Sequence, residues 1–113
     1  MRDFSVQIQD FFIKRGWQKE ASVFSASELK YDLLKKNIPI EIEIGHERLV
    51  YAVFFKYLLD YSKKKIPAGI LVVTGNPEKY IQKWHNSIKS TKRKLESVEN
   101  TYLVPILVLG VDP

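Results

Sequence analysis

The fold can be worked out from residues 29–45, which read Leu29-Lys30-Tyr31-Asp32-Leu33-Leu34-Lys35-Lys36-Asn37-Ile38-Pro39-Ile40-Glu41-Ile42-Glu43-Ile44-Gly45. Apolar and polar residues alternate on both sides of the polar break at residues 35–37, and a period of two is typical of β-strands. The second run is the clearer one, because isoleucine occupies every even position from 40 to 44 and Gly45 ends it. We therefore predict a β-hairpin, in which Pro39 is tolerated near the start of its strand.

Carboxylates occupy the second strand of this hairpin. Glu41 and Glu43 lie two residues apart, so both side chains should leave the same face of the sheet about 7 Å from each other. Antiparallel pairing would bring Asp32 of the first strand within reach of Glu41. Three like charges repel one another unless a cation bridges them, and oxygen ligands without cysteine favour Mg²⁺ or Mn²⁺ over zinc. The plain alternative is that Glu41 and Glu43 form a solvated strand face and that Asp32 is unrelated to them.

Further helices and strands are predicted on both sides of the hairpin. Before it, apolar spacing predicts an amphipathic helix over residues 3–15, closed by Gly16, and a short strand over 18–24. After it, the patterns predict a helix over 47–64, a buried strand over 68–73, a helix from Pro77 to about Leu95, and a strand over 102–109. In the helix over 47–64, Lys56, Asp60 and Lys63 lie off the apolar stripe. Pro105 predicts an edge position or a bulge for the last strand.

The predicted order is helix, three strands, helix, strand, helix, strand, which indicates an α/β fold with a mixed central sheet flanked by helices. The chain has 113 residues, 45% of them hydrophobic, so we expect residues 1–113 to form a single domain and exclude a disordered chain. With no cysteine, no signal peptide and no apolar run long enough to cross a bilayer, we expect a cytoplasmic protein without a membrane partner. The net charge of +5 favours a polyanionic partner such as nucleic acid.

The hairpin resembles the active-site hairpin of the PD-(D/E)XK nuclease superfamily. The resemblance lies in Asp32, eight intervening residues, Glu41-Ile42-Glu43 in an alternating strand, Gly45, and a following helix that carries Phe55-Lys56. The predicted element order is similar to the αβββαβ core of that superfamily, with one more helix and strand at the C-terminal end. Residues 40–73 most resemble the branch of type II restriction endonucleases that includes BamHI and BglII. Most superfamily members end the motif in lysine, whereas Glu43 stands here, as in that branch.

The resemblance implies a Mg²⁺-dependent DNA endonuclease, with Mn²⁺ as a substitute ion. It implies that Asp32, Glu41 and the backbone carbonyl of Ile42 bind the metal, and that Glu43 orients or deprotonates the attacking water. Lys56, or Lys30 beside Asp32, would supply the positive charge of the missing motif lysine; the alternative is a solvated lysine. Such sites often include a fourth acid from the first helix or strand. The candidates for it are Glu20, Asp10 and Gln7.

Basic residues are the expected DNA contacts, through backbone phosphates rather than base edges. They are His46 after Gly45, Lys63, Lys64 and Lys65 after the second helix, and Lys89, Lys92, Arg93 and Lys94 on the third. The alternative for these lysine runs is a solvated helix face. Since one site cuts one strand, cleavage of both strands would require a homodimer, formed through the helix over 47–64 or the last strand. Three other functions are a nuclease fold that binds DNA without cutting it, a junction-type nuclease, and an α/β domain that binds protein.

Overall fold

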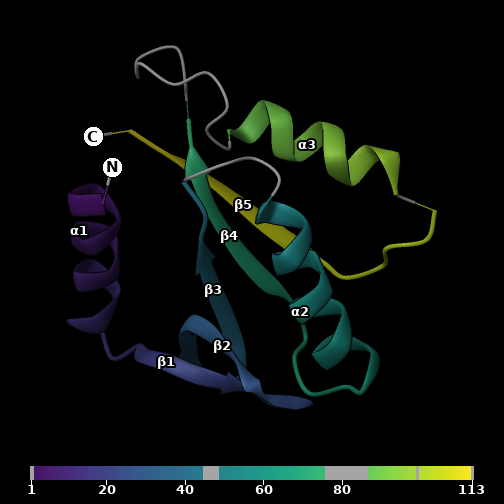
Figure 1. Cartoon of the computed structure of the whole chain (residues 1–113), viewed down its shortest axis with the longest axis horizontal. Coiled ribbons are helices and arrows are strands. Elements are labelled where there is room, and N and C mark those ends of the chain that lie inside the picture. Colours follow the sequence, from purple (N-terminus) through teal and green to yellow (C-terminus); the bar gives the residue numbers. More distant parts are fainter. Residues whose placement is uncertain (1, 45–48, 76–86, 99, 113) are drawn as a thin grey trace.

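The computed structural model describes residues 2–44, 49–75, 87–98 and 100–112 (Figure 1). Along the chain, its elements are α1 (Arg2–Ile13), β1 (Gln18–Val23), β2 (Ala26–Lys35), β3 (Ile38–Ile42), α2 (Val50–Ser62), β4 (Gly69–Thr74), α3 (Ile88–Ser97) and β5 (Ile106–Val111). The predicted order of helices and strands is confirmed. No helix in the described ranges is long and apolar enough to cross a membrane.

The strands form one five-stranded sheet in the order β1-β2-β3-β4-β5. β1, β2 and β3 pair antiparallel, whereas β3, β4 and β5 pair parallel. The chain therefore connects β3 to β4 through α2, and β4 to β5 through the segment that contains α3. This confirms the predicted mixed α/β sheet, in which a hairpin precedes parallel crossovers. β5 occupies the sheet edge, as Pro105 predicted, and Pro105 itself directly precedes the strand.

Helices cover both faces of the sheet (Figure 1). Beneath α2, the apolar side chains of Val53, Phe54 and Tyr57 pack in one buried cluster with Tyr31 and Leu71. On the opposite face, side chains of α1 pack against a second cluster formed by Leu33, Ile40 and Val72. The amphipathic pattern of α1 and α2 thus results from each helix burying one stripe on the sheet.

The third helix begins later than the sequence predicted. α3 starts at Ile88, because the backbone of Ser87 is extended (φ −132°, ψ 168°) and cannot continue a helix from Pro77. The Ser87 hydroxyl accepts a hydrogen bond from Ser90 N at 3.0 Å, and the Ser90 hydroxyl accepts one from Ser87 N at 3.0 Å. This capping box is a strong start signal, so the prediction of one helix over 77–95 is wrong. The predicted cap at Asn76 and Pro77 lies outside the described residues.

A Gly69→Ala substitution is expected to destabilise the protein by about 2 kcal/mol, because overpacking a core has a cost of this order. A Cβ at Gly69 would overlap the ring of Tyr57, which is fully buried and donates its hydroxyl hydrogen bond to Ile70 O. The ring is held at both ends and cannot move aside without losing that bond. Thermal unfolding monitored by circular dichroism measures the effect. A melting temperature equal to that of the wild type would contradict this packing.

Candidate active site

The β2–β3 hairpin sets the positions of the acids. Its observed pairs are Leu33 with Ile40, Leu34 with Pro39 and Lys35 with Ile38. The turn residues Lys36 and Asn37 have φ values of 50° and 63°, the left-handed conformation that tight hairpin turns need. Continuing this register by one residue places Asp32 opposite Glu41, as predicted. Asp32 also accepts a hydrogen bond at 2.7 Å from Ile42 N, which ties its carboxylate to β3.

Glu41 is buried, with 4% of its surface exposed. Lys56 of α2 lies on the face of the sheet to which Glu41 points, and its Nζ is 2.6 Å from Glu41 Oε1. Lys56 Nζ also donates a hydrogen bond to Lys30 O at 3.0 Å. The interpretation of Glu41 as part of a solvated strand face is therefore wrong, because α2 covers that face. Sequence alternation separates the two faces of a strand but does not show which helix lies on either of them.

Burial and like charge act together on these acids. Burial raises the pKa of Glu41 to about 8, and the charge of Asp32 adds to the rise, although Lys56 opposes both effects. Burial also raises the pKa of Glu43 to about 7, again with a contribution from Asp32 and opposition from Lys56. The charge of Asp32 therefore acts on both Glu41 and Glu43.

The pair of acids formed by Asp32 and Glu41 (the acid pair) fits a hard divalent cation. Carboxylate and carbonyl oxygens from Asp32, Glu41 and Ile42 are the ligand type that Mg²⁺ and Mn²⁺ prefer, and a cation would relieve the repulsion between the two carboxylates. Within the described ranges, no group of three or more acidic, histidine or cysteine side chains is arranged to hold a metal. Asp32 and Glu41 lie opposite each other on β2 and β3 and form a pair of carboxylates rather than a group of three. Mg²⁺ is commonly held by one or two carboxylates, with its other positions open to water and phosphate.

Glu20 lies on β1 between the pairs Lys19 with Leu33 and Ala21 with Tyr31, and hence level with Asp32. Its φ of 54° is unusual for a residue other than glycine. Its side chain is exposed, and no hydrogen bond or ion pair links it to the acid pair in the described part of the chain. The structure places Glu20 on the neighbouring strand without bringing it into contact with the other acids.

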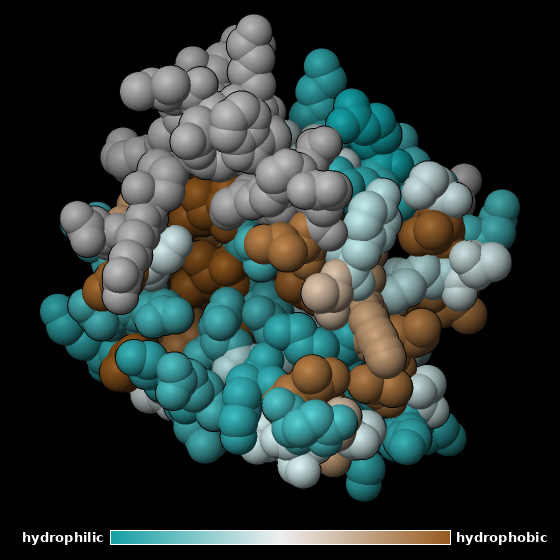
Figure 2. Space-filling view, viewed as in Figure 1, coloured by the Kyte–Doolittle hydropathy of each residue, from teal (hydrophilic) through white to brown (hydrophobic). Residues whose placement is uncertain are grey.

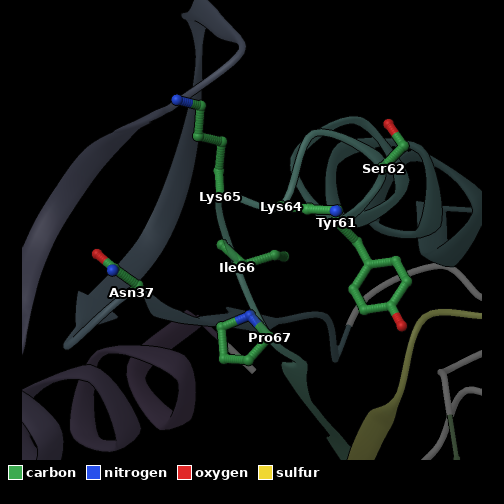
Figure 3. Close-up of a pocket in the computed structure, with 7 residues that line it drawn as sticks. All are labelled: Asn37, Tyr61, Ser62, Lys64, Lys65, Ile66 and Pro67. Atoms are coloured by element: carbon green, nitrogen blue, oxygen red, sulfur yellow. The ribbon is translucent and has the colours of Figure 1, made fainter.

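The predicted DNA contacts fall into two separate groups. Lys63, Lys64 and Lys65 follow the C-terminal end of α2 and are exposed. Figure 3 shows two of these lysines, Lys64 and Lys65, which line an open pocket of about 630 Å³ together with Asn37 of the β2–β3 turn. Lys89, Lys92 and Arg93 occupy the exposed face of α3. His46 lies outside the described residues.

Two charged side chains differ from their expected surface positions. Lys94 of α3 is buried, with 8% exposure, and its Nζ lies 5.9 Å from the centre of the Tyr51 ring. Asp60 of α2 is fully buried, although the sequence placed it on the polar side of its helix. The signal in the sequence was its spacing of four residues from Lys56, which puts both side chains on one helix face. The sequence analysis did not predict that Asp60 would be a buried hydrogen-bond acceptor.

Comparisons with known proteins agree with this fold. A family model described as restriction endonuclease BglII/BglIII matches residues 2–111. The chain matches no curated protein sequence. Among solved structures, it is similar to restriction endonuclease BglII complexed with a DNA 16-mer, with a TM-score of 0.77 and 15% sequence identity. That match covers 94% of this chain and 53% of the BglII chain, so this chain spans about half the length of the enzyme that it resembles.

Proposed function

Since the chain belongs to the restriction endonuclease BglII/BglIII family, we propose that it is a DNA endonuclease that hydrolyses phosphodiester bonds with Mg²⁺ or Mn²⁺. The observation that carries this proposal is the hairpin that holds Asp32 against β3 and buries Glu41 beside Lys56. A buried glutamate next to a half-buried aspartate has little structural benefit in itself, because taking charges out of water is costly. Such an arrangement is typical of a site that binds a cation.

Each residue of the site has a proposed role. Asp32 and Glu41 would hold the metal together with the carbonyl of Ile42, and Glu43 would orient or deprotonate the attacking water. When bound, a divalent ion lowers the pKa of a water ligand and neutralises charge on the phosphate. Lys56 would supply the positive charge that other superfamily members obtain from the motif lysine, since its Nζ already contacts Glu41. Glu20, level with Asp32 on β1, is the proposed further acid.

DNA binding is proposed for the basic residues at two places on the surface. The exposed face of α3 carries Lys89, Lys92 and Arg93, and the end of α2 carries Lys63, Lys64 and Lys65. His46, which follows the acid hairpin in sequence, is proposed as a further phosphate contact. The net charge of +5 supports phosphate binding, because neutralising phosphates releases counterions.

A homodimer would provide two sites for the two strands of a duplex. α2 exposes Tyr51, Phe55 and Leu58, which lie at positions i, i+4 and i+7 and so share one helix face. Figure 2 shows apolar groups among hydrophilic ones over the region of α2. We propose that this face of α2 meets its equivalent in a second copy, since self-complementary faces suit two-fold dimers.

A second candidate function is a DNA-binding protein of nuclease fold that is inactive or specific for DNA structure, such as junctions. The observation that favours it is the coverage of only 53% of the BglII chain. We also propose that residues 1–113 act as one nuclease domain. The absence of cysteine supports a reducing compartment, for which the cytoplasm is our proposal.

The experiment that tests the proposed function is nicking of supercoiled plasmid by the purified protein with Mg²⁺, Mn²⁺ or EDTA. We expect nicking with either metal and none with EDTA. Asp32→Asn is expected to abolish nicking, because it removes a proposed metal ligand. Glu28→Gln is the matched control, since Glu28 lies exposed on the same strand. Equal nicking by wild type and Asp32→Asn would locate the activity elsewhere. Retention of DNA at low salt without any cleavage of plasmid, single-stranded or branched DNA would favour the inactive DNA-binding protein instead.

A further inference from the structure

Asp60 of α2 is the centre of a buried hydrogen-bond cluster that has no part in the roles proposed so far. Its side chain has no exposed surface. Asp60 Oδ2 accepts hydrogen bonds from Phe24 N at 2.9 Å and from the Tyr31 hydroxyl at 2.6 Å, and its Oδ1 accepts one from Ser25 N at 2.7 Å. The carboxylate therefore holds the turn between β1 and β2, together with a side chain of β2, against α2.

This cluster is connected to the acid pair through the chain itself. Tyr31 directly precedes Asp32 on β2, and Lys56 lies four residues before Asp60 on the same face of α2. Lys56 Nζ donates to Lys30 O at 3.0 Å and contacts Glu41 at 2.6 Å. Two consecutive residues of β2, Lys30 and Tyr31, are thus attached to α2 immediately before the strand reaches Asp32.

We propose that Asp60 and Tyr31 are positioning residues of the nuclease, which hold Asp32 on β2 in a fixed position relative to Lys56 on α2 and Glu41 on β3. The proposal rests on the proposed function, because it assigns these acids to the reaction. Catalysis is sensitive to small displacements, and an error of about 1 Å in a reacting group can reduce a rate by about 10²-fold. The hydroxyl of Tyr31 and the carboxylate of Asp60 touch neither substrate nor metal in this assignment, so neither is a catalytic residue.

The decisive variant is Tyr31→Phe, which removes one hydroxyl and keeps the buried ring. Its matched control is Tyr102→Phe, because the Tyr102 hydroxyl also donates to α2, at 2.8 Å to Phe54 O, from a segment that carries none of the acids. We expect the single-turnover cleavage rate of Tyr31→Phe to fall about tenfold. DNA affinity measured in EDTA should stay within about twofold of that of the wild type. Tyr102→Phe should keep the wild-type rate even if its melting temperature falls equally.

The binding of Mn²⁺ alone to DNA-free protein, measured by calorimetry, provides a readout that needs no cleavage. Tyr31→Phe and Asp60→Asn are expected to bind Mn²⁺ more weakly than the wild type and Tyr102→Phe, because Asp32 would be held less firmly. If the wild type binds Mn²⁺ but cuts no DNA, the proposed function fails. The Mn²⁺ affinities of the variants then decide by themselves whether Tyr31 and Asp60 position Asp32. The proposal would be overturned if a folded Tyr31→Phe variant kept the wild-type cleavage rate and Mn²⁺ affinity. It would also be overturned if Tyr31→Phe and Tyr102→Phe lost cleavage rate and Mn²⁺ affinity equally. Absence of Mn²⁺ binding by the wild type would also overturn it.

Discussion

A Glu41→Gln variant is expected to lose DNA cleavage by about 10³-fold or more, which corresponds to about 4 kcal/mol of transition-state stabilisation. The substitution keeps the size and shape of a side chain that is 4% exposed, but it removes the charge proposed to bind the metal. It also removes the ionic partner of Lys56, whose Nζ is 2.6 Å from Glu41 Oε1. The measurement is the rate of plasmid nicking at saturating Mg²⁺.

Two further measurements distinguish a loss of the chemical step in Glu41→Gln from a loss of folding or of DNA binding. The melting temperature should stay close to that of the wild type, since glutamine fills the same space beneath α2. DNA affinity in EDTA should also be retained, because Glu41 contacts no phosphate without a metal in this proposal. Glu28→Gln again serves as the control for loss of one exposed carboxylate from the hairpin region. Undiminished nicking by Glu41→Gln would remove Glu41 from the reaction.

An Asp60→Ala variant is expected to destabilise the protein by about 3 kcal/mol, because it leaves three hydrogen-bond donors without their shared acceptor in a mostly buried place. For a domain of this size, that loss corresponds to a fall in melting temperature of roughly 15 °C. Thermal and urea unfolding measure it. Asp10→Asn is the control, since Asp10 is an exposed acid of α1. A melting temperature within about 2 °C of wild type would show that the cluster contributes little.

Asp60 should also make stability depend on pH at the acid end. Burial alone would raise its pKa, but the hydrogen bonds from Tyr31, Phe24 and Ser25 outweigh burial and hold the pKa below its ordinary value. A carboxyl whose pKa is lower in the folded state stabilises that state above its unfolded pKa, and this contribution is lost as the pH falls through the folded pKa. We therefore expect Asp60 to contribute fully above about pH 4 and progressively less below it. Urea unfolding from pH 7 to pH 2.5 should give a shallower acid decline for Asp60→Ala than for the wild type. Parallel curves for the two proteins would contradict this effect.

Residues 29–45 predicted the hairpin and brought Asp32 within reach of Glu41, because side-chain alternation is a local property of the chain. The register stayed open by one residue until the structure showed the turn at Lys36 and Asn37. The sequence pointed to Lys56 as the lysine near the acids but left Lys30 open as the alternative. In the structure Lys56 contacts Glu41, while Lys30 Nζ donates to Ser22 on β1 at 2.9 Å. The start of α3 was also missed. In the sequence, Ser87 and Ser90 of its capping box look like ordinary polar residues of one continuous amphipathic helix.

Local periodicity was thus sufficient for the order of elements and for the hairpin of acids, because each depends on residues close together in the chain. The mixed sheet followed from that order, since strands joined through a helix pair in parallel. Burial depends instead on which helix covers which face. α2 packs over β2 and β3 across a long sequence separation, and this packing makes Glu41 a buried acid beside Lys56 rather than a solvated one. The same contact turns Asp60 from a polar helix residue into the acceptor that holds the β1–β2 turn. Such interactions join distant segments, and their strength comes from exclusion of water, which no local pattern records.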